Sequence, residues 1–153
     1  MNNAESTAWN TFLSAHDRVL ARLDGDLAAE CGMTLAEYEV LLHLAEAPDQ
    51  RLRMNELAEL ARLSPSGLTR RFDALVRRGW VARERCEDDR RGVVAQLTAE
   101  GYERQKAAAP VHLRGTRAYF LDQLDDDQLS ALGSMMERVA ELSSERPTAL
   151  SRA

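Results

Sequence analysis

The chain has 153 residues, 44% of them hydrophobic, which is enough to bury one sizeable core, so we expect one structural domain per subunit over residues 1–153. No apolar run approaches the ~18 residues that indicate a membrane span, and the start MNNAESTAWN lacks a basic-then-apolar signal, so we expect a cytoplasmic protein that does not contact membranes. The net charge of −5 is unevenly distributed, because residues 62–92 hold nine arginines against five acidic residues and carry +4, which leaves −9 for the rest.

This charge pattern predicts a polyanionic partner. A polyanion would be attracted to residues 62–92 and repelled by the remainder of the chain, so nucleic acid is the first partner to consider. The two cysteines, Cys31 and Cys86, are too few and too far apart for a disulfide framework, and with three scattered histidines they form no zinc-ligand spacing. We therefore expect no metal and no other cofactor.

The N-terminal segment, about residues 5–30, is predicted to form an amphipathic helix. Its apolar and amphipathic side chains recur at steps of three and four residues, which is the spacing of one helix face. These residues are Trp9, Leu13, His16, Leu20, Leu23 and Leu27.

Residues 55–62 predict a short helix that leads into a turn at Leu63-Ser64. Asn55 is a suitable N-cap for this helix, and three apolar residues are expected to face inward. They are Leu57, Leu60 and Ala61.

A second helix is predicted from the N-cap Ser64, followed by Pro65, to about Arg78, where Gly79 can adopt the left-handed closing conformation. Leu68, Phe72, Leu75 and Val76 form one apolar stripe of this helix. Its opposite face consists of hydrogen-bonding side chains, namely Ser66, Thr69, Arg70, Asp73 and Arg77. Two short helices of which the second is basic on its outer side predict a helix-turn-helix, whose second helix fits a major groove.

After Gly79 the apolar period changes to two, which predicts a two-stranded hairpin. Its strands are expected at residues 80–85 and 92–97, with a polar tip at residues 86–91. A basic hairpin that directly follows a helix-turn-helix is a wing. Arg90 and Arg91 at its tip are expected to reach phosphates or an adjacent minor groove.

The C-terminal part predicts two more helices. The first begins at Thr98 as its N-cap, and Pro110 is expected to bend it. The second begins at about Asp125 and carries Leu129, Leu132, Met136, Val139 and Leu142 on one side. A small winged helix cannot cover the apolar faces of both terminal segments, so we expect them to pack against a second copy of the chain across a two-fold axis, or else as an intramolecular bundle.

The run ELAELARLSPSGLTRRFDALVRRGWVARERCEDDRRGVVAQLTAEG resembles the winged-helix core of MarR-type (multiple antibiotic resistance regulator) transcription factors, and DDRRG…V…LT…G is the most specific part of the match. The upstream MTLAEYEVLLHLAE resembles the helix that precedes this core. The resemblance covers roughly residues 9–142. It implies a mainly α fold with a small β-hairpin wing, in which a winged helix-turn-helix at about residues 35–97 is joined to helical dimerisation regions at about residues 5–30 and 98–145.

The resemblance also implies a homodimer that binds DNA through two winged helices and is controlled by a small molecule or an oxidant. Two recognition helices related by a two-fold axis predict a palindromic operator in double-stranded DNA. The expected DNA contacts are Ser64, Ser66, Gly67, Thr69, Arg70, Arg77, Arg90 and Arg91. Relatives bind aromatic or anionic effectors between the terminal helices and the core. The amphipathic residues expected near such a cleft are Trp9, His16, Tyr38 and His43, each of which also has a packing or surface interpretation.

Three functions remain open from the sequence. The first is a repressor that a small-molecule effector releases from DNA, and the second is a redox-sensing regulator that uses Cys86 or Cys31. The third is a winged helix that binds another protein and no DNA. We do not expect an enzyme, because no GxSxG, HExxH or phosphate-binding glycine loop is present and Asp125 to Asp127 suit a helix N-terminus without any chemistry.

Overall fold

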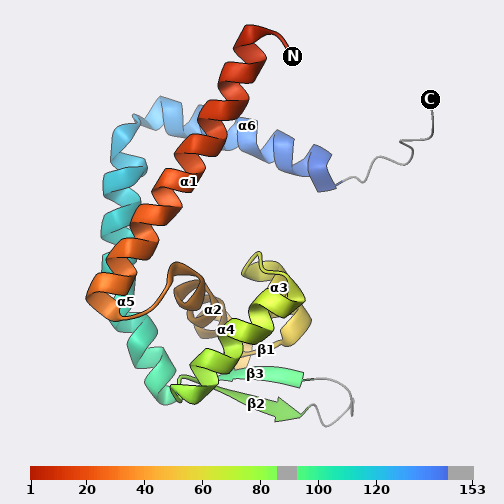
Figure 1. The fold of residues 1–153 in the computed structure, drawn as a ribbon, viewed down its shortest axis with the longest axis vertical. Helices are drawn as coiled ribbons and strands as arrows, with labels where there is room; N and C mark the ends of the chain where they lie inside the picture. Colours follow the sequence, from red (N-terminus) through yellow and green to blue (C-terminus); the bar gives the residue numbers. More distant parts are fainter. Residues whose placement is uncertain (86–92, 145–153) are drawn as a thin grey trace, which may run out of the picture.

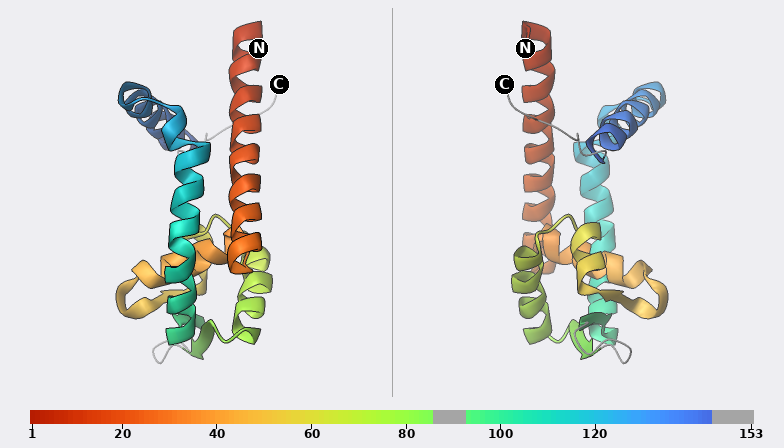
Figure 2. Two further views of the ribbon diagram at one scale, coloured as in Figure 1. Left: turned by 90° about the vertical axis from the view of Figure 1, so that its left-hand side faces the viewer. Right: turned by 90° about the vertical axis from the view of Figure 1, so that its right-hand side faces the viewer.

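The computed structural model describes residues 1–85 and 93–144, and it shows a small winged-helix core at one end of a pair of long helices (Figure 1). The pair consists of α1 (Asn3–Cys31) and α5 (Ala99–Tyr119), which lie side by side in all views (Figure 2). Helix α6 (Asp126–Ser144) follows the short 3-10 helix η2 (Leu121–Gln123) and turns away from this pair. The predicted fold class is confirmed.

Helix α1 confirms the predicted N-terminal helix and slightly extends it. A capping box starts it, because the Asn2 side chain accepts a hydrogen bond from the Glu5 N–H at 2.9 Å while Glu5 accepts one from the Asn2 N–H at 2.7 Å. It ends at Gly32, whose φ of +66° is the left-handed conformation that favours glycine.

The core is built on α2 (Leu35–Glu46), α3 (Met54–Leu60) and α4 (Pro65–Arg77). Helix α4 agrees with the predicted second helix at both ends, and α2 agrees with the helix that the resemblance implied. Fully buried side chains from these helices form one contiguous cluster with the end of α1. They are Phe72, Leu27, Leu41, Leu44, Leu57, Leu68, Leu75 and Val40.

Two predictions for α3 are wrong. The N-cap is Arg53 rather than Asn55, because the Glu56 side chain accepts a hydrogen bond from the Arg53 N–H at 3.1 Å and so starts the helix earlier. Leu60 is 48% exposed rather than inward, because the helix ends at this residue and the chain reverses at Arg62, which has a φ of +53°. Leu57 and Ala61 are buried as predicted.

The sheet has three antiparallel strands rather than the predicted two. Strands β2 (Val81–Arg85) and β3 (Val93–Leu97) form the expected hairpin, in which Val81 pairs with Leu97 and Arg85 with Val93. Strand β1 (Arg51–Arg53) pairs with the other edge of β3, after the 3-10 helix η1 (Pro48–Gln50). The sequence gives no sign of β1, because three residues are too short to show a period of two.

Helix α5 begins as predicted and confirms its cap. The Thr98 hydroxyl accepts a hydrogen bond from the Gly101 N–H at 3.0 Å and donates one to the Gly79 carbonyl at 2.7 Å, which links the start of α5 to the end of α4. The helix continues without interruption through Pro110. Among the described residues, no helix is both long enough and apolar enough to span a bilayer.

Candidate nucleic-acid interface

The N-terminus of α4 is shaped by Ser64 and Gly67. The Ser64 Oγ accepts a hydrogen bond from the Gly67 N–H at 3.1 Å and lies 3.3 Å from the Ser66 Oγ. A Cβ atom at Gly67 would lie 2.9 Å from the Ser64 Oγ, so glycine allows this close approach. Small polar groups therefore surround the start of the helix, where the positive end of the helix dipole attracts anions.

The outer face of α4 carries the predicted polar and basic side chains. Thr69, Arg70 and Arg77 are all exposed. The Thr69 hydroxyl donates to the Pro65 carbonyl at 2.9 Å, which fixes its rotamer. The guanidinium groups of Arg70 and Arg77 have no hydrogen bond or ion pair with another described residue. Both arginines are therefore available to a partner outside the chain.

The negative charge of Asp73 on the same helix is balanced by an arginine of the wing. It forms an ion pair with Arg83 of β2, and the Arg83 guanidinium also lies over the Phe72 ring at 5.3 Å. This pair holds β2 against α4 and reduces the negative charge on the outer face of α4. Arg83 was not among the site residues predicted from the sequence, although a basic residue in the strand that follows a helix with an exposed acidic residue was a usable signal. Arg90 and Arg91 lie outside the described residues.

A cleft of about 690 Å³ lies between α1, the start of α2 and the turn that precedes α4. Its polar walls include Asp24 from α1, Glu39 from α2 and Arg62 from the turn. The Arg62 Nη2 donates to Glu39 at 2.6 Å, so an ion pair joins the turn to α2 within the wall of the cleft. Its apolar walls include Leu20, Leu35 and Leu63, and His16 also lines it.

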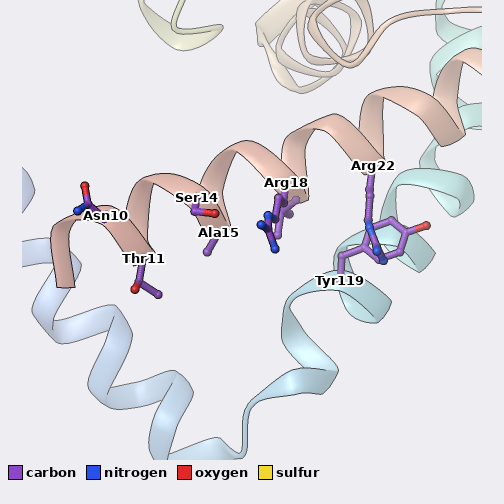
Figure 3. Close-up of a pocket in the computed structure, with 8 residues that line it drawn as sticks. Asn10, Thr11, Ser14, Ala15, Arg18, Arg22 and Tyr119 are labelled. Atoms are coloured by element: carbon purple, nitrogen blue, oxygen red, sulfur yellow. The ribbon is translucent and has the colours of Figure 1, made fainter. Parts of the chain in front are cut away.

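Two further hollows lie along α1. An apolar groove of about 570 Å³ is lined by Phe12, His16, Val19, Phe120, Leu132 and Met136, from α1, α6 and the segment between α5 and α6. A polar pocket of about 500 Å³ is lined by Asn10, Thr11, Ser14, Arg18, Arg22 and Tyr119 (Figure 3). In this pocket the Tyr119 hydroxyl donates to Asp26 at 2.7 Å, and this bond raises the pKa of Tyr119.

The structure does not bring the four predicted effector residues together. His16 lines the cleft and the apolar groove, whereas Trp9 is 54% exposed and packs beside Phe12 at a ring distance of 6.2 Å. Tyr38 is buried and stacks on His112 at 4.7 Å. Burial raises the pKa of Tyr38 and lowers the pKa of His112, so both groups favour their neutral forms. His43 is partly buried on α2 and lines none of these three hollows.

The thiol of Cys31 is not set up as a thiolate. It is partly buried near the end of α1, and burial together with the neighbouring Glu30 raises its pKa, although Arg114 opposes this. A raised pKa lowers the fraction of the nucleophilic thiolate form at neutral pH. Cys86 lies outside the described residues.

The comparisons with known proteins agree on one family. A sequence model of the MarR family matches residues 32–92. The HTH-type transcriptional repressor YetL of Bacillus subtilis is 29% identical over 143 residues, which are 90% of this chain and 86% of that protein.

Two solved structures from Streptomyces coelicolor are similar over almost the whole chain. Sco3205, a MarR family transcriptional regulator solved in complex with DNA, is 37% identical with a TM-score of 0.90, and the match covers 97% of this chain and 91% of that one. AbsC, a MarR family transcriptional regulator, is 33% identical with a TM-score of 0.89, and the match covers 95% and 98%. The chain forms a winged helix that exposes basic residues on α4, and it is similar over almost its whole length to two regulators of one family. It therefore belongs to the MarR family of transcriptional regulators.

Proposed function

We propose that this protein is a transcriptional repressor that binds double-stranded DNA as a homodimer, with α4 of each subunit in a major groove. The observation that carries the proposal is the outer face of α4, where Arg70 and Arg77 are exposed and have no partner among the described residues. A free guanidinium has five N–H donors for base edges or phosphates. YetL is named a repressor and Sco3205 was solved in complex with DNA, which supports the same role here.

Exposed apolar side chains on α1 and α6 support the homodimer. Trp9 and Phe12 on α1 are 54% and 47% exposed, and Met135 and Val139 on α6 are 53% and 56% exposed. Large apolar side chains gathered on two neighbouring elements indicate an interaction surface. A two-fold axis would let this surface cover its own copy.

We expect the operator to be an imperfect palindrome with half-sites about one helical turn apart, ~10 bp centre to centre, because two recognition helices must enter successive major grooves ~34 Å apart. Selection from random duplexes, followed by footprinting and by size measurement of the complex, checks this expectation. Affinity should also fall steeply with salt concentration as arginines release counterions from phosphates. A single unrepeated site bound by a monomer would contradict the dimeric mode.

We also propose that a small aromatic or anionic effector releases the protein from DNA by binding in the cleft between α1, α2 and the turn before α4. The cleft combines apolar walls with the Arg62–Glu39 ion pair, and an anion could compete with Glu39 for Arg62. It borders both α1, which belongs to the proposed dimer, and the turn that leads into α4. The effector can weaken operator binding only by the ratio of its affinities for the DNA-binding and the non-binding conformations of the protein. A ~100-fold ratio corresponds to ~2.7 kcal/mol.

We expect His16→Ala to blunt effector-induced release while it leaves operator affinity without effector within a few-fold. His43→Ala is the matched comparison and should keep the wild-type response, since His43 lines none of the three hollows. A panel of aromatic carboxylates and phenols is added to the protein–operator complex, and fluorescence anisotropy of labelled operator reports release. An unchanged response in His16→Ala, with the dimer intact, would remove His16 from the effector site.

The two alternative functions have simple tests. Alkylation of Cys31 and Cys86 with iodoacetamide tests the redox alternative. If the protein is controlled by an effector, operator binding should not change, whereas a redox sensor should bind the operator with altered affinity. A salt titration with random duplex separates DNA binding from a protein-binding winged helix, because only the former shows a strong salt dependence.

A further inference from the structure

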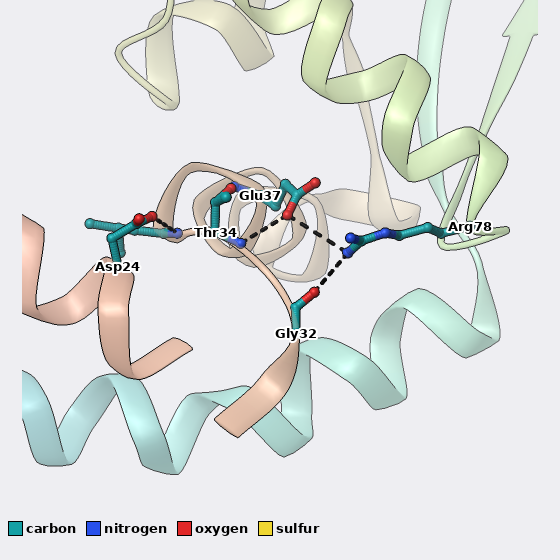
Figure 4. Close-up of polar contacts among 6 residues, drawn as sticks. Asp24, Gly32, Thr34, Glu37 and Arg78 are labelled. Atoms are coloured by element: carbon teal, nitrogen blue, oxygen red, sulfur yellow. Dashed lines mark hydrogen bonds and ion pairs between the residues drawn. The ribbon is translucent and has the colours of Figure 1, made fainter. Parts of the chain in front are cut away.

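The side chain of Arg78, directly after α4, reaches the junction between α1 and α2 (Figure 4). Its Nη1 donates a hydrogen bond to the Gly32 carbonyl at 3.0 Å and lies 3.7 Å from a carboxylate oxygen of Glu37. Its guanidinium also lies over the Trp80 ring at 4.8 Å. One guanidinium thus joins the end of α4 to the end of α1, to α2 and to the residue before β2.

The junction that Arg78 contacts is well defined. Thr34 and Glu37 form a capping box, in which Glu37 accepts a hydrogen bond from the Thr34 N–H at 2.8 Å. The Leu35 N–H donates to Asp24 of α1 at 2.7 Å, which ties the start of α2 to α1. Glu37 is only 7% exposed, and a carboxylate so far from water needs hydrogen-bond and ion-pair partners to offset the cost of its burial.

We propose that Arg78 is a positioning residue, which fixes the direction of α4 relative to α1 and thereby sets the separation of the two recognition helices in a DNA-bound dimer. The inference rests on the proposed function, because α1 defines a separation only if it belongs to the dimer interface. Helix α4 has 13 residues and is therefore about 20 Å long. A tilt of about 10° around its Arg78 end moves its N-terminus by about 3 Å, close to one base-pair step of ~3.4 Å.

The expected result is a loss of spacing selectivity in Arg78→Gln. Wild type and variant are titrated with duplexes that carry two half-sites at centre-to-centre distances of about 9, 10, 11 and 12 bp. Wild type should prefer one spacing by about 10-fold or more. Arg78→Gln should bind this spacing about 10-fold more weakly and the others nearly as wild type does, with an unchanged salt dependence. Arg78→Lys, which can keep one charged contact to the junction, should recover part of the preference.

Two matched arginine variants separate positioning from other roles. Arg104→Gln removes a guanidinium that lies over the same Trp80 ring at 5.5 Å from α5, and it should keep the wild-type preference. Arg77→Gln should weaken binding at every spacing and reduce the salt dependence, as expected for a phosphate contact. If Arg78→Gln behaves as Arg77→Gln does, or keeps the wild-type preference, the proposal is wrong.

The outcome stays interpretable when one variant is unstable or the proposed function fails. Glu37→Gln removes the charge that faces Arg78 but keeps an oxygen for the Thr34 N–H, and it should reduce spacing selectivity in the same direction as Arg78→Gln. If Arg78→Gln does not fold, Glu37→Gln decides the question. A folded Glu37→Gln dimer that keeps the full wild-type preference for one half-site spacing would contradict the positioning role. Wild type that binds no duplex would refute the proposed function instead.

Discussion

Gly101→Ala is expected to destabilise the protein by about 3 kcal/mol or more, which lowers the melting temperature by roughly 10 °C. A Cβ atom at this position would lie 1.9 Å from the Trp80 carbonyl oxygen and 2.9 Å from the Leu97 side chain. That carbonyl also accepts the hydrogen bond of the Thr98 N–H at 3.1 Å, so it cannot move without loosening the start of α5. The free-energy cost of this clash far exceeds the ~1 kcal/mol by which alanine is more favourable than glycine inside a helix.

Gly25→Ala is the matched control for this prediction. Gly25 also lies within a helix, α1, but a Cβ atom there would meet nothing within 4 Å. We therefore expect this variant to gain ~0.5–1 kcal/mol from helix propensity. The melting temperatures of wild type, Gly101→Ala and Gly25→Ala should be compared at one subunit concentration, because the stability of a dimer depends on concentration. Equal melting temperatures for both variants would contradict the close packing of α5 on Trp80.

The sequence predicted most of the fold because the relevant signals are local. Ser64 with Pro65 and Gly79 marked the ends of α4, and Thr98 marked the start of α5. Strand β1 and the N-cap of α3 were missed or wrong, because both depend on contacts rather than on local pattern. Strand β1 exists only by pairing with β3, which lies more than 40 residues away in the sequence. The Glu56 side chain bonds the Arg53 N–H and displaces the better local cap Asn55.

The candidate site could be predicted only in part, for the same physical reason. The exposed side chains of α4 follow from helix periodicity, so Arg70 and Arg77 were recognised from the sequence alone. The ion pair of Asp73 with Arg83 and the contacts of Arg78 with Gly32 and Glu37 join separate elements. Their partners are set by tertiary packing, which no spacing within one helix reveals. Two local signals at the α1–α2 junction were not recognised from the sequence: Gly32, which ends α1, and the Thr34 and Glu37 capping box that begins α2.

Arg70→Ala is expected to weaken operator binding about 100-fold or more while random duplex loses only a few-fold. A bidentate contact between arginine and guanine discriminates by ~1–3 kcal/mol, and a dimer would make this contact twice. Arg70 is suited to it, because it is exposed on the outer face of α4 and no described residue holds its guanidinium. Competition titrations with operator and random duplex at fixed salt concentration measure both affinities.

Two further variants test whether Arg70 acts through its geometry or only through its charge. Arg70→Lys keeps the positive charge but lacks the planar fork, so it should bind random duplex as wild type does and still lose most of its preference for the operator. Arg90→Ala, in the predicted wing tip, should weaken binding to operator and random duplex to a similar extent, because a phosphate or minor-groove contact carries little base information. If Arg70→Ala weakens both duplexes equally, Arg70 contacts the DNA backbone and another side chain of α4 must read the bases. If Arg70→Lys retains full operator preference, the positive charge at this position is sufficient and the planar fork is not required.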